Sequence, residues 1–167
     1  MELMVAMVII GILGAVVVPL MRPDSPRVVR EKFIAQLAAL VGFAAQNAII
    51  TGKTNNITFN IERKKVGVYV GRDGGKVPLA SAYTLSSIKI PDQLQVMNFY
   101  IEGNDELGRY GSGGDVWFYV LPEGFAQPVI INLLDTKDKI GRRNRRFSLV
   151  LNPFSAQFEV YSEFKNP

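Results

Sequence analysis

An uninterrupted apolar segment near the N-terminus constrains this chain more than any other feature of its sequence. Residues 3–21 are 19 consecutive residues without a charged or strongly polar side chain, and among them Gly11, Gly14 and Pro19 alone are neither aliphatic nor methionine. As a helix, this segment would span about 28 Å, close to the thickness of the hydrocarbon core of a bilayer. We therefore predict a transmembrane anchor in residues 1–21, in preference to a cleaved signal peptide or a buried core helix.

The rest of the chain has the composition of an ordinary globular body. The 167 residues are 48% hydrophobic, but without residues 1–21 the share falls to about 43%. Cysteine and histidine are absent. This excludes disulfides, Cys/His metal sites, thiol nucleophiles and a Ser-His-Asp triad. We predict no enzymatic activity, no cofactor and no metal site.

One carboxylate lies at the edge of the apolar segment. Glu2 has no cation within helical reach on its C-terminal side. An unpaired carboxylate beside hydrocarbon is costly and usually marks a functional residue. The alternative is that Glu2 lies in the head-group layer as part of a frayed terminus, and the residue pattern alone leaves both interpretations open.

The order of residues 2–19 resembles the N-terminal helix of type IV pilins and type II secretion pseudopilins. Glu2, Gly11, Gly14 and Pro19 stand at the matching positions. The resemblance implies that Glu2 neutralises the methylated amino terminus of a neighbouring subunit during filament assembly. It also implies that the two glycines and the proline let the helix unwind as subunits pack, although glycines also permit close helix–helix approach.

The charges that flank the segment give a conflicting orientation. Basic residues follow it and none precedes it, which by the positive-inside rule would place the body in the cytoplasm. In the family, a basic leader ending in glycine precedes a phenylalanine and is removed by prepilin peptidase. Both are absent before Glu2, so we expect that the start has been trimmed. The resemblance then implies a single-pass protein of the inner membrane with its body in the periplasm.

Residues 22–52 are predicted to form an amphipathic helix. Pro23 and Pro26 interrupt the apolar segment, Ser25 is a suitable N-cap, and Gly52 is a suitable C-terminal stop. Whether the helix continues through the prolines is left open. The apolar side chains expected to pack on a sheet recur at helical spacing: Val29, Phe33, Leu37, Leu40, Ala44 and Ala48.

Residues 53–167 are predicted to form an antiparallel β body, which gives an α+β fold. Short apolar segments alternate with turn residues, and short connections favour antiparallel pairing. About eight strands would form two packed sheets or one curved sheet under the helix. The expected strands are residues 56–62, 66–71, 83–90, 94–101, 115–120, 129–134, 146–152 and 157–161.

A helix followed by antiparallel strands without a disulfide resembles the minor pseudopilins called general secretion pathway protein H and the FimT-type minor pilins. Residues 43–53, 121–126 and 147–156 carry this resemblance. It implies a structural subunit of the type II secretion pseudopilus, with a type IV pilus minor pilin as the alternative. The implied partners are other pilins or pseudopilins, the inner membrane, prepilin peptidase for the precursor, and secreted cargo.

An arginine cluster is the sharpest charge feature of the body. Arg142, Arg143, Arg145 and Arg146 lie within five residues. Such a cluster can contact phosphates, so DNA is the alternative partner. A solvated hairpin or a salt-bridged subunit contact accounts for the same pattern.

Glycine-rich residues 108–114 lie between acidic residues. Asp105, Glu106 and Asp115 offer oxygen ligands for calcium. Their spacing matches no known calcium loop, so we predict a flexible, solvated loop.

Overall fold

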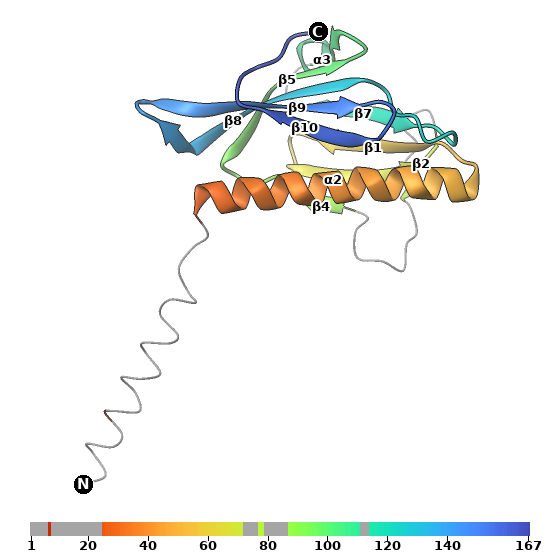
Figure 1. The fold of residues 1–167 in the computed structure, drawn as a ribbon, viewed down its shortest axis with the longest axis horizontal. Coiled ribbons are helices and arrows are strands. Elements are labelled where there is room, and N and C mark those ends of the chain that lie inside the picture. Colours follow the sequence, from red (N-terminus) through yellow and green to blue (C-terminus); the bar gives the residue numbers. More distant parts are fainter. Residues whose placement is uncertain (1–6, 8–24, 72–76, 79–86, 111–113) are drawn as a thin grey trace.

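The computed structural model describes Met7 and residues 25–71, 77–78, 87–110 and 114–167. In this part of the chain, one long helix lies along one side of a body of two β-sheets (Figure 1). The predicted anchor residues Glu2, Gly11, Gly14 and Pro19 lie outside the described residues.

Helix α2 (Pro26–Thr51) lies within the predicted segment 22–52, between the predicted caps Ser25 and Gly52. The hydroxyl oxygen of Ser25 accepts a hydrogen bond from the Val28 amide at 3.4 Å, and Pro26 occupies the first turn. Gly52 ends the helix with a φ of 64°, a left-handed conformation that favours glycine. Local capping chemistry therefore sets both boundaries.

The buried face of α2 differs from the predicted stripe at its first turns. The five predicted residues from Phe33 to Ala48 are buried, and Val41 and Ala45 widen the stripe. Val29, however, is only half-buried, and its neighbour Arg30 is buried instead. The reason is a pair of carboxylates on the facing sheet, which no helical periodicity can reveal.

By length and composition alone, α2 could cross a membrane. It has 26 residues and a mean hydropathy of 1.7, and no other helix among the described residues meets that test. Eight of its side chains are nevertheless buried against the body, so these properties are also those of a core helix.

The two sheets are antiparallel throughout. The first has the order β3-β2-β1-β7, with β4 also pairing with β2, and the second has the order β10-β9-β8-β5-β6. Strands of the first sheet are β1 (Asn55–Asn60), β2 (Lys65–Val70), β3 (Val77–Pro78), β4 (Ser87–Lys89) and β7 (Asp115–Val120). Strands of the second are β5 (Leu94–Ile101), β6 (Asn104–Asp105), β8 (Val129–Ile140), β9 (Arg143–Asn152) and β10 (Gln157–Tyr161). The predicted antiparallel α+β architecture is confirmed.

The observed strand bounds agree with the predicted ones for some strands and differ for others. β5, β7 and β10 have the predicted limits. β8 continues six residues beyond the predicted end, and β9 begins three residues earlier, because pairing resumes after an irregularity that follows Asp135, with Lys139 opposite Asn144 and Ile140 opposite Arg143. The expectation of a loop at residues 108–110 is wrong, since the short helix α3 (Glu106–Tyr110) includes them.

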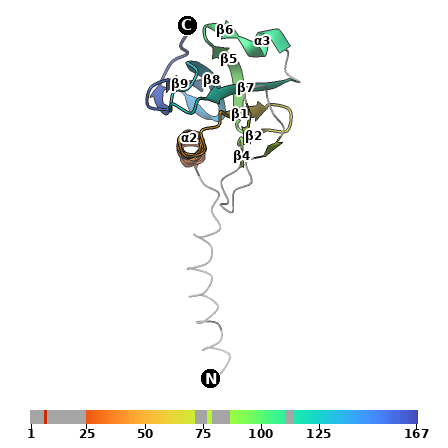
Figure 2. The same ribbon diagram turned by 90° about the vertical axis from the view of Figure 1, so that its right-hand side faces the viewer.

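Three phenylalanines from both sheets form the centre of the core. The ring of Phe59 on β1 packs edge-on against Phe99 on β5, with centroids 5.0 Å apart, and both rings approach Phe118 on β7. All three side chains are almost completely buried. Viewed along α2, the helix lies against strands of both sheets (Figure 2).

We expect Phe99→Ala to lower the free energy of unfolding by about 3–5 kcal/mol, because it removes a buried ring and leaves a cavity. Phe154→Ala is a matched control, since Phe154 is 78% exposed and packs edge-on against Phe125. Its cost should not exceed about 1 kcal/mol. Chemical denaturation of both variants measures the difference, and equal losses would contradict this account of the core.

Candidate functional site

The arginine cluster lies at the tip of the hairpin formed by β8 and β9. We call residues 137–146 the basic hairpin. Its turn contains Gly141, with a φ of 64°, and Ile140 pairs with Arg143 on either side of it. The hairpin projects beyond the sheet and past the N-terminal end of α2 (Figure 1).

A bulge in β8 shapes the base of the basic hairpin. The register shifts between Asp135 and Lys139. The carboxylate of Asp135 is completely buried, and its Oδ1 accepts hydrogen bonds from the Lys137 and Asp138 amides at 3.1 and 3.0 Å. This carboxylate therefore satisfies the backbone groups that the bulge removes from the ladder.

Arg30 ties the base of the hairpin to the first turns of α2. Its Nη1 lies 3.3 Å from Asp135 Oδ2 and also donates to Asp138 Oδ2. Arg145 forms an ion pair with the same Asp138 oxygen, Nε to Oδ2, at 2.8 Å. Gln93 donates to Asp135 at 3.3 Å and to the Pro26 carbonyl at 2.8 Å. Helix, bulge and hairpin are thus held in one polar cluster.

The charges of this cluster shift the ionisation of Asp138. The hydrogen bond from Arg30, with the nearby charge of Arg145, holds the pKa of Asp138 below its usual value despite partial burial. Asp138 is therefore ionised at neutral pH and forms ion pairs with both Arg30 and Arg145.

The opposite side of the hairpin faces the C-terminal tail, residues 162–167. The guanidinium of Arg146 lies over the ring of Phe164, 5.3 Å from its centroid. The buried side chains of Asn132 and Ser148 also form hydrogen bonds with the tail. Asn132 Nδ2 donates to the Lys165 carbonyl at 3.0 Å, and the Lys165 amide donates to Ser148 Oγ at 2.9 Å. The tail and α2 thus hold the hairpin from two sides.

These contacts set Arg145 apart from the other arginines of the predicted cluster. Arg145 is half-buried and paired with Asp138, whereas Arg142, Arg143 and Arg146 are exposed, although Arg146 also packs on Phe164. Among the ion pairs of the described residues, none includes Arg142 or Arg143. The sequence did not reveal that Arg30, more than 100 residues away, completes the cluster, because no local pattern links the two segments.

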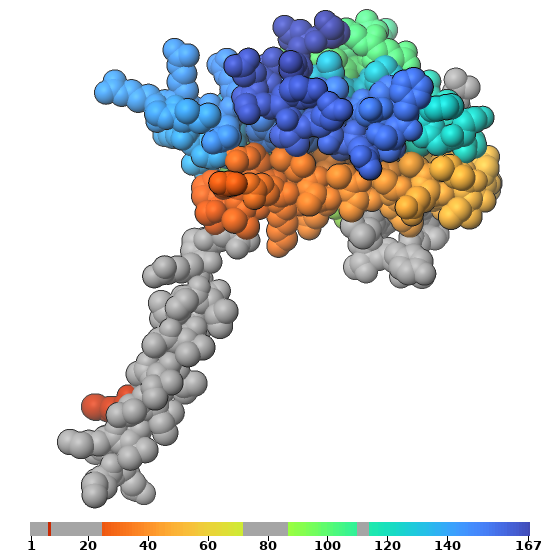
Figure 3. All heavy atoms as spheres, in the orientation of Figure 1, coloured from red at the N-terminus to blue at the C-terminus, as the bar shows by residue number. Residues whose placement is uncertain are grey.

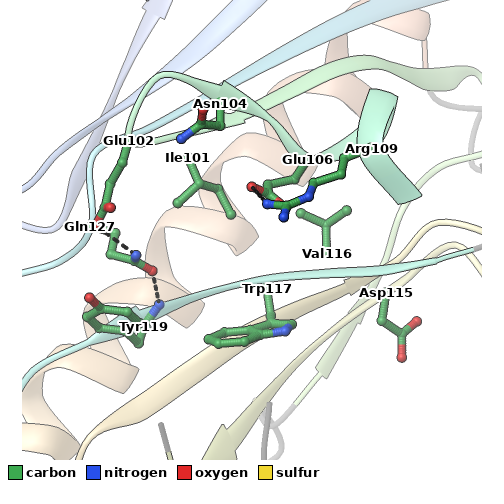
Figure 4. Close-up of a pocket in the computed structure, with 10 residues that line it drawn as sticks. All are labelled: Ile101, Glu102, Asn104, Glu106, Arg109, Asp115, Val116, Trp117, Tyr119 and Gln127. Carbon is green, nitrogen blue, oxygen red and sulfur yellow. Dashed lines mark hydrogen bonds and ion pairs between the residues drawn. The ribbon is translucent and has the colours of Figure 1, made fainter. Parts of the chain in front are cut away.

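A second polar site lies between β7 and the segment of β5, β6 and α3. Trp117 and Tyr119 line one wall, and Glu106 with Arg109 lines the other (Figure 4). Gln127 donates to Glu102 at 2.9 Å. The volume of the pocket, about 220 Å³, is below the range usual for small-molecule sites.

Asp105 has a structural role at the start of α3. Its Oδ1 accepts from the amides of Phe99, Leu107 and Gly108, and its Oδ2 accepts from Asn98. Burial raises the pKa of Asp105, but these hydrogen bonds outweigh it, so the pKa lies below its usual value. The described residues contain no group of three His, Cys, Asp or Glu side chains placed to hold a metal ion.

We expect Arg30→Met to destabilise the protein by about 3 kcal/mol, because it leaves Asp135 buried without its cation. Arg27→Met is the matched control on the same helix. Arg27 pairs with Glu31 in solvent, so its loss should cost less than about 1 kcal/mol. Unfolding in urea compares the two variants, and similar midpoints would show that the buried pair is not a structural tie.

Acidification should weaken the same cluster. Because the folded state lowers the pKa of Asp138, its contribution to stability is complete above about pH 4 and is lost as the pH falls through the lower, folded-state pKa. Asp138→Asn should therefore lose less stability than the wild type between about pH 7 and pH 3. Parallel pH dependences of the unfolding free energy would rule out this contribution.

No protein-family model and no curated protein matches this sequence. Two solved structures of the minor pseudopilin EpsH from the type 2 secretion system of Vibrio cholerae are similar in fold. The first covers 86% of this chain and 100% of its own, with a TM-score of 0.54 and 11% sequence identity. The second covers 82% and 93%, with a TM-score of 0.50 and 11% identity. The chain therefore has the pilin-like α+β fold that is seen in the minor pseudopilin EpsH.

Proposed function

We propose that this protein is a minor pseudopilin, a structural subunit of a type II secretion pseudopilus. The observation that carries the proposal is the similarity in fold to EpsH over most of the chain. The apolar segment of residues 3–21, with Glu2 at its edge, is independent support from the sequence. In this role the protein assembles with other subunits and catalyses no reaction.

The outer face of α2 suits an assembly role. The helix lies along one edge of the body, and its outer face is left uncovered (Figure 3). Near its C-terminal end, Ile49 and Ile50 are 57% and 82% exposed. The exposed rings of Phe125 and Phe154, with centroids 5.7 Å apart, add further apolar surface. Exposed aliphatic and aromatic side chains of this kind are typical of protein–protein contacts.

The proposed location is the inner membrane. Residues 1–21 would form the single transmembrane anchor, residues 22–52 the amphipathic helix and residues 53–167 the β body in the periplasm. Prepilin peptidase would process the precursor, and other pseudopilins and secreted cargo would be the partners in the periplasm.

A type IV pilus minor pilin is the second candidate. The exposed pair Arg142 and Arg143 favours it, because a positively charged tip can contact the phosphates of DNA. Complementation separates the two roles: a pseudopilin restores export of secreted proteins, and a minor pilin restores surface pili.

We expect Glu2→Ala to leave the precursor in the membrane but to exclude the subunit from filaments. In the proposed assembly, the lost carboxylate no longer neutralises the amino terminus of a neighbour in hydrocarbon. Glu62→Ala, at an exposed position of the β1–β2 turn, is the control and should assemble normally. Co-purification with the pseudopilus reports incorporation, and normal incorporation of Glu2→Ala would refute this role.

A further inference from the structure

The tip of the basic hairpin has a chemistry that filament assembly does not require. Lys137, Lys139, Arg142 and Arg143 are exposed there. Ile140, next to the turn, is 58% exposed. The one acidic residue of the basic hairpin, Asp138, is already paired with Arg30 and Arg145. The tip therefore combines an excess of positive charge with an exposed aliphatic side chain.

A hollow beside the tip has the same mixed character. It has a volume of about 440 Å³ and lies between the basic hairpin and the C-terminal tail. Ile140 and Phe164 supply apolar surface, and Arg143 and Arg146 supply guanidinium groups. Glu163 also lines it. A ligand with a phosphate next to an aliphatic portion would match both kinds of side chain.

The basic hairpin also has a fixed position relative to the start of α2. The buried contacts of Arg30 with Asp135 and Asp138 hold the hairpin against the first turns of the helix. The tip extends past that end of α2, as Figures 1 and 3 show. Surface charge at the tip is thus presented on the side from which the chain enters the body.

The length of the connection limits how far this end of α2 can lie from a membrane anchor. Three residues separate Met21, the end of the apolar segment, from Ser25 at the N-cap of α2. Even fully extended, this connection spans about 14 Å. If residues 3–21 cross the bilayer, as the proposed function requires, the start of α2 and the adjacent hairpin lie near the head groups.

We propose that the tip of the basic hairpin docks on anionic phospholipids of the membrane that anchors the protein. Arg142 and Arg143 bind the lipid phosphates, while Ile140 enters the interface beside them. This inference rests on the anchorage in the proposed function. Ile140 favours lipid over DNA as the partner, because an exposed aliphatic side chain adds nothing to a contact with a phosphate backbone. Docking would orient the body on the membrane before its assembly.

Site-directed labelling of the full chain in vesicles tests the docking. Because the chain contains no cysteine, Lys139→Cys and Ser155→Cys each give one labelling site. The first lies in the basic hairpin and the second in the exposed turn at the far end of β9. We expect a spin label at position 139 to enter the head-group region when phosphatidylglycerol is present and to remain in water in phosphatidylcholine alone. The label at position 155 should stay in water in both.

Substitutions at the tip then separate charge from apolar contact. Arg142→Gln with Arg143→Gln should lower the ratio of docked to free hairpin by about fivefold for each arginine removed. Lys53→Gln with Arg109→Gln removes the same charge at the C-terminal end of α2 and in α3, and should change the ratio little. Ile140→Gln should also reduce docking. Thermal unfolding of each variant checks that the body remains folded.

Two kinds of result would overturn the docking. The first is a label at position 139 that reports the same environment with both lipids. The second is binding of duplex DNA or of an acidic protein that displaces the tip from the vesicle surface, if Ile140→Gln leaves the binding of that competitor to the tip unchanged. Alkaline carbonate extraction distinguishes failure of the anchorage: release of the protein would refute the anchor and the docking together. Retention of the protein with an insensitive label would refute the docking alone.

Discussion

The buried ion pair between Arg30 and Asp135 fixes how the helix, the sheets and the hairpin lie relative to one another. Asp135 is fully buried, and removing a cation from such a carboxylate is expensive. Helix α2 must therefore meet β8 in the one register that brings Arg30 to the bulge. Gln93, which bonds to Asp135 and to the first turn of α2, adds the segment before β5 to the same arrangement.

In this body, apolar contacts stabilise the core, whereas polar contacts position the hairpin. The rings of Phe59, Phe99 and Phe118 join the two sheets without directional bonds, and their burial supplies most of the stabilisation at the centre. The polar cluster at Arg30 and the tail contacts at Ser148 are directional. They position the hairpin, whose exposed tip carries the charges that a partner would meet.

Contacts within the body reduce the positive charge that the four clustered arginines offer to a partner. Asp138 neutralises part of the charge, and the guanidinium of Arg146 packs on Phe164. The exposed surface of the basic hairpin has three arginines, two lysines and one aliphatic residue. Such a surface suits an anionic interface with an apolar layer beneath it better than a uniform row of phosphates.

The sequence by itself determined the α+β class, the limits of α2 at Ser25 and Gly52 and the regular strands, because caps and apolar alternation act within a few residues. The apolar segment beside Glu2 likewise determined the prediction of an anchor. The tertiary structure alone decided that Arg30 is buried, that the β8–β9 hairpin is long, and that Arg145 is the one member of the arginine cluster that is partly buried. These features depend on the carboxylates of Asp135 and Asp138, more than 100 residues from Arg30, and on the ring of Phe164 in the tail. Local periodicity in the sequence carries no information about such distant partners.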